Sequence, residues 1–482
     1  MVYMFINKDI LTSGVVISNG SGVINVQGFM TAFVGEVFEI NISSSVKTLG
    51  IVVNLYRDET MNLIIGALLV DINAKVGEGA KLSGTSKLLT IVLGDFTIGS
   101  ILDAVGTFIL NDSKINVESK WLVESPAPGI IDRQSVCEPL QTGIMSIDAM
   151  IPIGRGQREL IVGDRQSGKT SICIDTILNQ KSNNVICVYN PVGAKASSVL
   201  EVFISLTSRN ASEFTSFIIA SASSSACSQY LSTYTAVALC EYFCVNKGLP
   251  AFIVYDDLSR HAVAYRELSL LLRRPPGREA YPGEIFFVHS RLLERAVKLN
   301  DNLGGGSITA FPVIETLAGD VSGYITTNVI SITDGQIFLS TELFLSGVKP
   351  AVDVGLSVSR VGSAAQNNEM RIVAGSYKLE LAQFVELQSF SQFASDLGEE
   401  TKQRLDKGNR LVELLKQENG SPINVIKQVI LLSLANQDVI SKVSLSNINK
   451  FVNFYLSVPI WLQEYIPARL LGLSIAKIVN KN

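Results

Sequence analysis

An eight-residue pattern, G-x-x-x-x-G-K-[ST], constrains the fold of this chain more than any other feature. Its residues are Gly163, Asp164, Arg165, Gln166, Ser167, Gly168, Lys169 and Thr170. The short apolar run 158–162 precedes the pattern, and residues 171–178 favour a helix. Glycines let backbone N–H groups close around a polyphosphate, and the start of a helix adds its positive dipole end. The pattern therefore predicts a strand, a loop and a helix that together bind a nucleotide.

Individual side chains in and after this pattern are predicted to bind phosphate or Mg²⁺. Lys169 can reach the terminal phosphates, the Thr170 hydroxyl can hold Mg²⁺, and Ser171 is included as a further nucleotide-binding residue. Downstream, an apolar strand signal ends in Asp256 and Asp257, where proteins with this loop hold Mg²⁺ directly or through water. We predict Asp256 as a Mg²⁺ ligand and Asp257 as a structural residue. The predicted cofactors are ATP or ADP with Mg²⁺.

The segment expected to supply a general base for hydrolysis contains no acid. Such a carboxylate orients the attacking water and lies after the helix that follows the loop. Here that segment is 188–198, and Glu201 comes only well inside the next predicted helix. The site is therefore predicted to hold a nucleotide without turning it over.

Three patterns of apolar residues divide the 482-residue chain. Short apolar segments alternate with Gly and Ser turns up to about residue 85, which indicates an antiparallel β-barrel. Strand signals alternate with helical stretches over 86–366, which predicts an α/β, RecA-like P-loop nucleotide-binding domain. Strand signals cease after that point, so 367–482 is predicted to form an α-helical bundle.

Composition excludes several classes of protein. A net charge of −4 argues against a non-specific grip on nucleic acid, and no apolar run reaches the length of about 18 residues that a membrane span needs. The six cysteines form no C-x-x-C pair, so we expect buried free thiols in a reducing compartment. His261 and His289, in predicted helices, are expected to be structural.

By these motifs the chain resembles the alpha subunits of F-type ATP synthases over essentially its whole length. The matching stretches are 151–160, 255–259, 269–283, 328–339 and 354–366. The resemblance implies a rotary, proton-translocating complex that makes ATP, in which three alpha and three beta subunits alternate around a gamma shaft. It also implies peripheral stalk subunits as partners, although the family's arm before the barrel is expected to be nearly absent here. In such complexes alpha holds Mg-nucleotide without turnover, and beta catalyses.

The resemblance assigns a role in the partner's reaction. Arg360 matches the arginine that alpha extends into the neighbouring beta site, and Ser357, at the same strand end, is expected to support its approach. Ala194 stands where alpha subunits usually carry Gln and beta carries its catalytic Glu. The subunit is thus expected to belong to an enzyme complex without being catalytic itself.

The adenine pocket is also inferred from the resemblance. Phe344 and Lys349 match a family Phe and Arg beside the base. Gln417 ends the Leu-Leu-Lys-Gln motif of the helical domain that the family uses there, and Asn419 stands two residues later, where the family usually has Gln. Lys349 lacks the planar fork of Arg. Because both Lys349 and Asn419 differ from the usual family residues, we expect this chain to bind the base more loosely than its relatives do.

Alternative functions stay open at this point. A catalytic beta-type subunit needs a Glu near Ala194, and a hexameric RNA translocase needs a basic, aromatic amino-terminal face. A structural ring subunit with an empty nucleotide site is a further alternative. The acidic balance, the lack of a leader and the drifted sequence favour the matrix side of the mitochondrial inner membrane, with a plastid thylakoid or bacterial plasma membrane as alternatives.

Overall fold

A computed structural model describes residues 12–20, 22–42, 47–57, 61–70, 76–109, 119–391, 398–436, 439–458 and 468–479. Its internal contacts divide the chain into two compact units. The first comprises 1–133, 186–314 and 322–332, and the second comprises 134–185, 315–321 and 333–482. Both units therefore interleave in sequence, and the domain boundaries predicted near residues 85 and 366 stay predictions.

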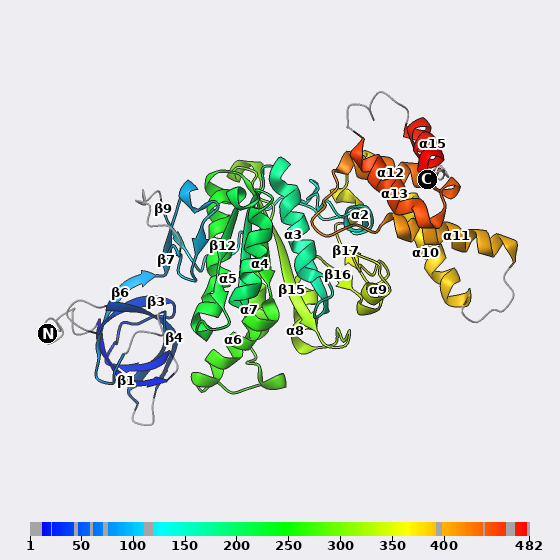
Figure 1. The fold of residues 1–482 in the computed structure, drawn as a ribbon. Helices are drawn as coiled ribbons and strands as arrows, with labels where there is room; N and C mark the ends of the chain where they lie inside the picture. Colours follow the sequence, from blue (N-terminus) through cyan, green and yellow to red (C-terminus); the bar gives the residue numbers. More distant parts are fainter. Residues whose placement is uncertain are drawn as a thin grey trace, which may run out of the picture. The chain divides into compact units, whose positions relative to one another are not determined.

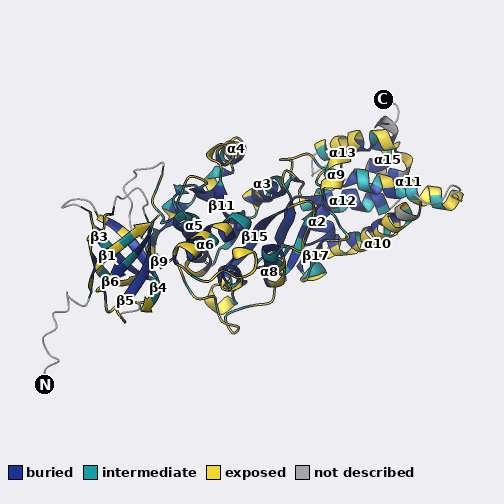
Figure 2. Ribbon diagram, turned by 90° about the horizontal axis from the view of Figure 1, so that it is seen from below, coloured by how far each residue is buried: buried dark blue, intermediate teal, exposed yellow. Residues whose placement is uncertain are grey.

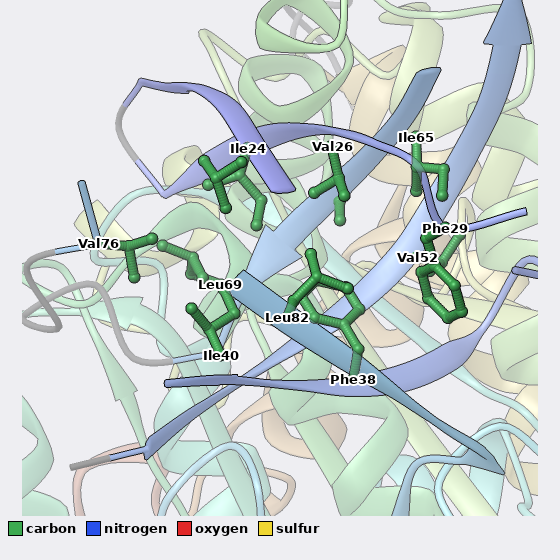
Figure 3. Close-up of a cluster of buried hydrophobic side chains, with 12 residues drawn as sticks. Ile24, Val26, Phe29, Phe38, Ile40, Val52, Ile65, Leu69, Val76 and Leu82 are labelled. Carbon is green, nitrogen blue, oxygen red and sulfur yellow. The ribbon is translucent and has the colours of Figure 1, made fainter. Parts of the chain in front are cut away.

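The first unit opens with a closed antiparallel barrel in the strand order β1-β2-β5-β4-β3-β6 (Figure 1). The strands are β1 (Ser13–Gly20), β2 (Val23–Gln27), β3 (Glu36–Asn41), β4 (Lys47–Arg57), β5 (Leu63–Leu69) and β6 (Lys81–Leu88). Apolar side chains from all six strands fill the interior. Figure 3 labels examples that come from β2 to β6. Gly50 leaves the space that the Phe38 ring occupies, so a side chain there has no room. The predicted barrel is confirmed.

Parallel strands continue the first unit in the order β8-β12-β11-β14-β15. They are β8 (Ile101–Leu102), β12 (Thr215–Ile218), β11 (Ile186–Ala194), β14 (Pro250–Asp256) and β15 (Ser307–Thr316), and β13 (Ala220–Ser221) pairs with β11. The helices are α4 (Ala196–Thr207), α5 (Ala226–Glu241), α6 (Leu258–Leu271), α7 (Ile285–Leu293) and α8 (Tyr324–Ile332). Helices α4, α5 and α6 pack on β11, which Figure 2 shows as buried. Covered parallel strands explain the continuous apolar runs in the sequence, and the predicted α/β architecture is confirmed.

A two-stranded ribbon of β7 (Thr90–Leu93) and β9 (Ser119–Leu122) is fixed to this unit by a buried ion pair. Arg295 is only 1% exposed and donates from Nε and Nη2 to the Glu241 carboxylate at 2.6 Å each. Trp121 of β9 donates its indole N–H to the same carboxylate. The charges of Arg295 and Glu241 thus neutralise each other inside this unit.

The second unit contains β10 (Leu160–Asp164), which pairs in parallel with β16 (Gly335–Leu339), and β17 (Val358–Ser359), which is antiparallel to β16. Its helices are α2 (Met145–Met150), α3 (Lys169–Asn179), α9 (Thr341–Leu345), α10 (Asn368–Ser391), α11 (Glu399–Leu414), α12 (Val425–Asn436), α13 (Ile448–Ser457) and α15 (Ala468–Val479). Helix α10 packs on α11 and α12, and α13 packs on α15. Among the described residues β17 is the last strand, so the predicted C-terminal helical domain is confirmed.

The histidines lie in helices, as the sequence predicts, and both are buried. His261 Nδ1 of α6 lies 3.3 Å from His289 Nε2 of α7, within hydrogen-bonding distance. Burial lowers the pKa of His261 to about 4 and that of His289 well below its usual value, so both rings stay neutral near pH 7. Their contacts support the structural role predicted for them.

The prediction of buried thiols is wrong for one cysteine. Cys137 is exposed, whereas Cys173, Cys187, Cys227, Cys240 and Cys244 are buried, and all six are free. Cys137 precedes the Pro139–Gly154 bridge and belongs to no helix or strand. No helix in the described part of the chain is both long and apolar enough to cross a membrane.

Candidate functional site

The predicted strand, loop and helix around the phosphate loop are all present. Strand β10 ends at Asp164 and α3 begins at Lys169. Between them Gln166 and Gly168 adopt positive φ angles of 62° and 97°, which turn the backbone sharply into the helix. Gly163 lies so close to β16 that an added Cβ would stand 2.8 Å from the Leu339 carbonyl oxygen. Gly168 therefore permits the left-handed turn into α3, and Gly163 permits the close approach of β10 to β16.

Asp164 braces the loop from behind. Its carboxylate accepts hydrogen bonds from the Thr316 hydroxyl at 2.7 Å, the Gly319 N–H at 2.8 Å and the Thr341 hydroxyl at 3.0 Å. Burial opposes ionisation, but these donors and the Lys169 ammonium lower the pKa of Asp164 below its usual value. Asp164 is therefore a structural hydrogen-bond acceptor, and it does not line the cavity in front of the loop.

A cavity of about 250 Å³ opens in front of the loop. It is lined by Ile144, Gln166, Ser167, Gly168, Lys169, Thr170, Ser171, Ile172, Asp175, Phe344, Lys349, Pro350, Ala351, Gln417 and Asn419. The structure thus brings the predicted phosphate-loop residues 166–171 together with the four residues predicted near the adenine. Gly163, Asp164 and Arg165 of the motif are not among the lining residues.

Two polar groups in this cavity fit a polyphosphate. The Ser167 hydroxyl is buried and has no hydrogen-bond partner within the described part of the chain. Lys169 is 9% exposed, and its ammonium donates to the Gly163 carbonyl at 2.8 Å. A buried hydroxyl without a partner and a buried ammonium held by backbone carbonyls are both satisfied better by phosphate oxygens. The donor set therefore matches the nucleotide that the motif predicts.

At the other end of the cavity, Lys349 and Phe344 lie together. The Lys349 ammonium stands 4.7 Å from the centre of the Phe344 ring, which is a cation–π contact. Phe344 is half-buried, so one ring face can take a planar base. This is the one aromatic side chain among the residues that line the cavity.

Gln417 holds the cavity wall in place. Its side-chain amide donates to the carbonyls of Gly143 and Ser421 and accepts from the Met145 N–H. These contacts use both ends of the amide, so Gln417 contributes by fixing the wall rather than by an open polar group. Asn419, two residues on, is exposed and lines the same cavity.

Several lining residues were not predicted from the sequence. Asp175 follows Ser171 by four residues, a spacing that places both on one face of α3 and could have revealed it. Its carboxylate accepts from the Gly420 N–H at 2.6 Å and so fixes the loop that carries Asn419. Ile144, Pro350 and Ala351 reach the cavity from distant segments and carry no local signal.

The two predicted Mg²⁺ ligands belong to different units. Thr170 lies in the first turn of α3 in the second unit, and Asp256 ends β14 in the first unit. Asp256 accepts a hydrogen bond from the Tyr189 hydroxyl at 2.7 Å. Asp257 caps α6 by accepting from the Arg260 N–H at 2.7 Å, which agrees with the structural role predicted for it.

The end of β11 carries no carboxylate. Ala194 is its last residue, and the preceding Gly193 carbonyl accepts a hydrogen bond from the Arg260 guanidinium. No acidic residue occurs between Asn190 and Ser198. The position at which a general base is expected is thus occupied by the methyl group of Ala194.

Arg360 and Ser357 flank β17. Ser357 is buried, and its hydroxyl donates to the Asp353 carbonyl and accepts from the Phe338 N–H at 2.9 Å, which ties this segment to β16. Arg360 donates its backbone N–H to the Asp334 carbonyl at 2.8 Å, while its side chain is exposed. Within the described residues its guanidinium forms no ion pair. The structure therefore fixes the backbone of Arg360, and no described residue forms an ion pair with its side chain.

A phosphate loop, an aromatic residue beside it, an N-terminal barrel and a C-terminal helical domain define a P-loop nucleotide-binding protein. Residues 143–359 match the nucleotide-binding domain of the ATP synthase alpha/beta family, and residues 366–459 match the C-terminal domain of the ATP synthase alpha/beta chain. The two matches cover well over half of the chain, and the chain belongs to the ATP synthase alpha/beta family. These domains support an F1-type ATP synthase subunit, a member of a hetero-oligomeric complex that binds nucleotide and takes part in ATP synthesis.

Proposed function

We propose that this chain is the non-catalytic, alpha-type subunit of its ATP synthase. It holds Mg-ATP or Mg-ADP at its own phosphate loop and supplies Arg360 to the catalytic site of a neighbouring beta subunit. The observation that carries the proposal is the end of β11, where Ala194 stands and no acid follows as far as Ser198. Without a carboxylate to orient water, a bound nucleotide is retained and not hydrolysed.

Each lining group has a task toward the nucleotide. Lys169 and the loop N–H groups bind the terminal phosphates, and the Ser167 hydroxyl gives a further hydrogen bond. Thr170 would hold Mg²⁺, which neutralises phosphate charge when it is bound, and Asp256 is proposed as a second ligand from the sequence motif alone. Phe344 stacks on the base. Lys349, whose ammonium lies 4.7 Å from the centre of the Phe344 ring, adds a single charge without the fork of Arg.

Arg360 suits a role in another subunit's reaction. Its guanidinium is permanently charged, exposed and without an ion pair among the described residues. A cation of this kind stabilises the charge that develops on a transferring phosphoryl group when it is placed beside it. Ser357 supports this role by fixing the strand from which Arg360 extends.

The proposal includes the assembly and its place in the cell. The chain alternates with beta in a ring around a gamma shaft, contacts the peripheral stalk, and serves proton-driven ATP synthesis on the matrix side of the mitochondrial inner membrane. Membership of the ATP synthase alpha/beta family supports the assembly. Fractionation of the source cells tests the location, and recovery with thylakoids or a bacterial plasma membrane would contradict it.

The purified chain, free of beta, tests the division of labour. We expect it to bind Mg-ATP at one site per chain and to release no phosphate in steady state. Steady-state turnover would show a catalytic, beta-type subunit, and absence of binding would show a structural subunit with an empty site. Ala194→Glu is the matched control and should remain inactive, because the site would still lack a neighbour's arginine.

A further inference from the structure

A buried carboxyl group lies next to the strands that position Arg360. Glu159 directly precedes β10 and is fully buried. A Cβ atom added at Gly335 of β16 would lie 2.6 and 2.8 Å from the two Glu159 oxygens. Gly335 pairs with Ser359 across the β16–β17 ladder, and Arg360 is the next residue. The Glu159 carboxyl therefore packs against the base of the segment from which the exposed guanidinium extends.

One oxygen of this carboxyl is anchored and the other is not. Gln157 donates to Glu159 Oε2 at 2.7 Å and lies 3.2 Å from the Ser359 hydroxyl. Ser359 in turn donates to the Pro152 carbonyl at 2.7 Å. Glu159 Oε1 has no hydrogen-bond partner within the described part of the chain. A fully buried carboxylate with one unsatisfied oxygen is costly, so the neutral acid is favoured.

Among the described residues, two charged groups act electrostatically on Glu159. Asp334, in the turn before β16, is already neutralised by Arg158, which donates from Nε at 2.9 Å and from Nη2 at 2.8 Å. Arg360 is the second, and its exposed guanidinium has no ion pair among the described residues. Burial raises the pKa of Glu159 well above its usual value; the Gln157 hydrogen bond opposes this, Asp334 adds to it, and Arg360 opposes it.

We propose that Glu159 is a positioning residue for Arg360. Neutral Glu159 leaves the Arg360 guanidinium free to reach a partner's phosphate, and ionised Glu159 draws that guanidinium back toward β17. The inference rests on the proposed trans-acting role of Arg360. Among the described residues, Arg360 is the cation that favours an ionised Glu159, whereas Arg158 is held by Asp334 in two hydrogen bonds. The proton that leaves Glu159 passes to solvent, and no other group changes charge.

The pH profile of turnover in a ring reconstituted with beta tests this role. Glu159→Gln keeps the shape of the side chain and an oxygen for Gln157, but it cannot ionise. Wild-type turnover should fall about tenfold for each pH unit above the midpoint of Glu159 ionisation, until the contribution of Arg360 is lost. Glu159→Gln should lack that alkaline fall, and Glu138→Gln, a more exposed glutamate beside Arg155, should keep it. Identical profiles for Glu159→Gln and wild type would overturn the proposal.

A second measurement does not depend on catalysis. Infrared spectroscopy of the ring follows the C=O band of protonated carboxyl groups as pH rises. Removing the Arg360 charge by Arg360→Ala should move the loss of one such band to higher pH, because this guanidinium favours the ionised form of Glu159. An unchanged titration would contradict the coupling. If Arg360→Ala leaves turnover normal, the proposed function fails; if turnover falls while both Glu159 readouts stay unchanged, only this inference fails.

Discussion

The phosphate-loop cavity and the end of β17 differ in where their polar groups find partners. In the cavity, Lys169, Asp175 and Gln417 are held by groups of this same chain, and the lining comes from several separate segments. At the end of β17, Arg360 is exposed and its charge is unpaired among the described residues. We propose that the first region binds this chain's own nucleotide and that the second contributes to a site on another subunit. Substitutions in the cavity should therefore change nucleotide binding by this chain, whereas substitutions at the end of β17 should change turnover on the neighbouring subunit.

The largest effect is expected from Arg360. In a reconstituted ring, Arg360→Ala should lower turnover on beta by about 10³–10⁵-fold, or roughly 4–7 kcal/mol of transition-state stabilisation. The ring should still assemble, because the backbone contact to Asp334 does not use the side chain. Arg360→Lys is the control for charge alone and should recover little. Steady-state rates of phosphate release at saturating Mg-ATP measure both.

Arg295 provides the opposite case, an arginine whose partner lies inside the chain. Glu241→Ala leaves its buried guanidinium unpaired and should destabilise the first unit by about 3–5 kcal/mol. The exposed pair Lys47–Glu39, at 2.7 Å, is the matched control, and Glu39→Ala should cost about 0–1 kcal/mol. Chemical denaturation of the purified chain compares the variants. Equal losses would mean that the Arg295–Glu241 contact is not the buried anchor described above.

Lys169 tests the cavity itself. Lys169→Ala removes one charge-assisted contact to phosphate and should weaken nucleotide binding by about 1.5–3 kcal/mol, or roughly 10- to 150-fold. Equilibrium binding to the beta-free chain measures the change. Arg165 belongs to the same motif but does not line the cavity, so Arg165→Ala should bind nearly as wild type. Equal binding by wild type and Lys169→Ala would remove the phosphate-loop assignment.

A smaller effect is expected from the buried histidines. Because the folded-state pKa of His261 is lowered to about 4, folding keeps it neutral where the unfolded chain, with its ordinary pKa near 6.5, takes up a proton. The stability it contributes is complete above pH 6.5 and is lost as pH falls toward 4. By pH 5 this loss should reach about 2 kcal/mol. The melting temperature should fall less between pH 7 and pH 5 in the variant His261→Gln/His289→Gln than in the wild type, as measured by thermal unfolding.

The sequence was most informative where chemistry is local. The phosphate loop predicted β10 and α3 because its glycines and lysine act over a few residues, whereas β6, with the sequence KLSGTSKL, shows little apolar alternation and is a strand because it closes the barrel between β1 and β3. The role of Arg360 came from a resemblance alone, since an exposed arginine has no signature of its own. Glu159 was missed because its burial depends on pairing between β16 and β17. Cys137 was misjudged because thiols carry no mark of exposure in sequence.

The central claim is that one region of this chain serves its own ligand and the other serves a partner. Native mass spectrometry of reconstituted rings, with turnover measured on the same samples, tests both at once. We predict that Arg360→Ala rings keep nucleotide in this chain while turnover falls at least about 10³-fold. Lys169→Ala rings should lose that nucleotide and fall far less in turnover. Near-normal turnover in Arg360→Ala rings, or loss of this chain's nucleotide from them, would contradict the account.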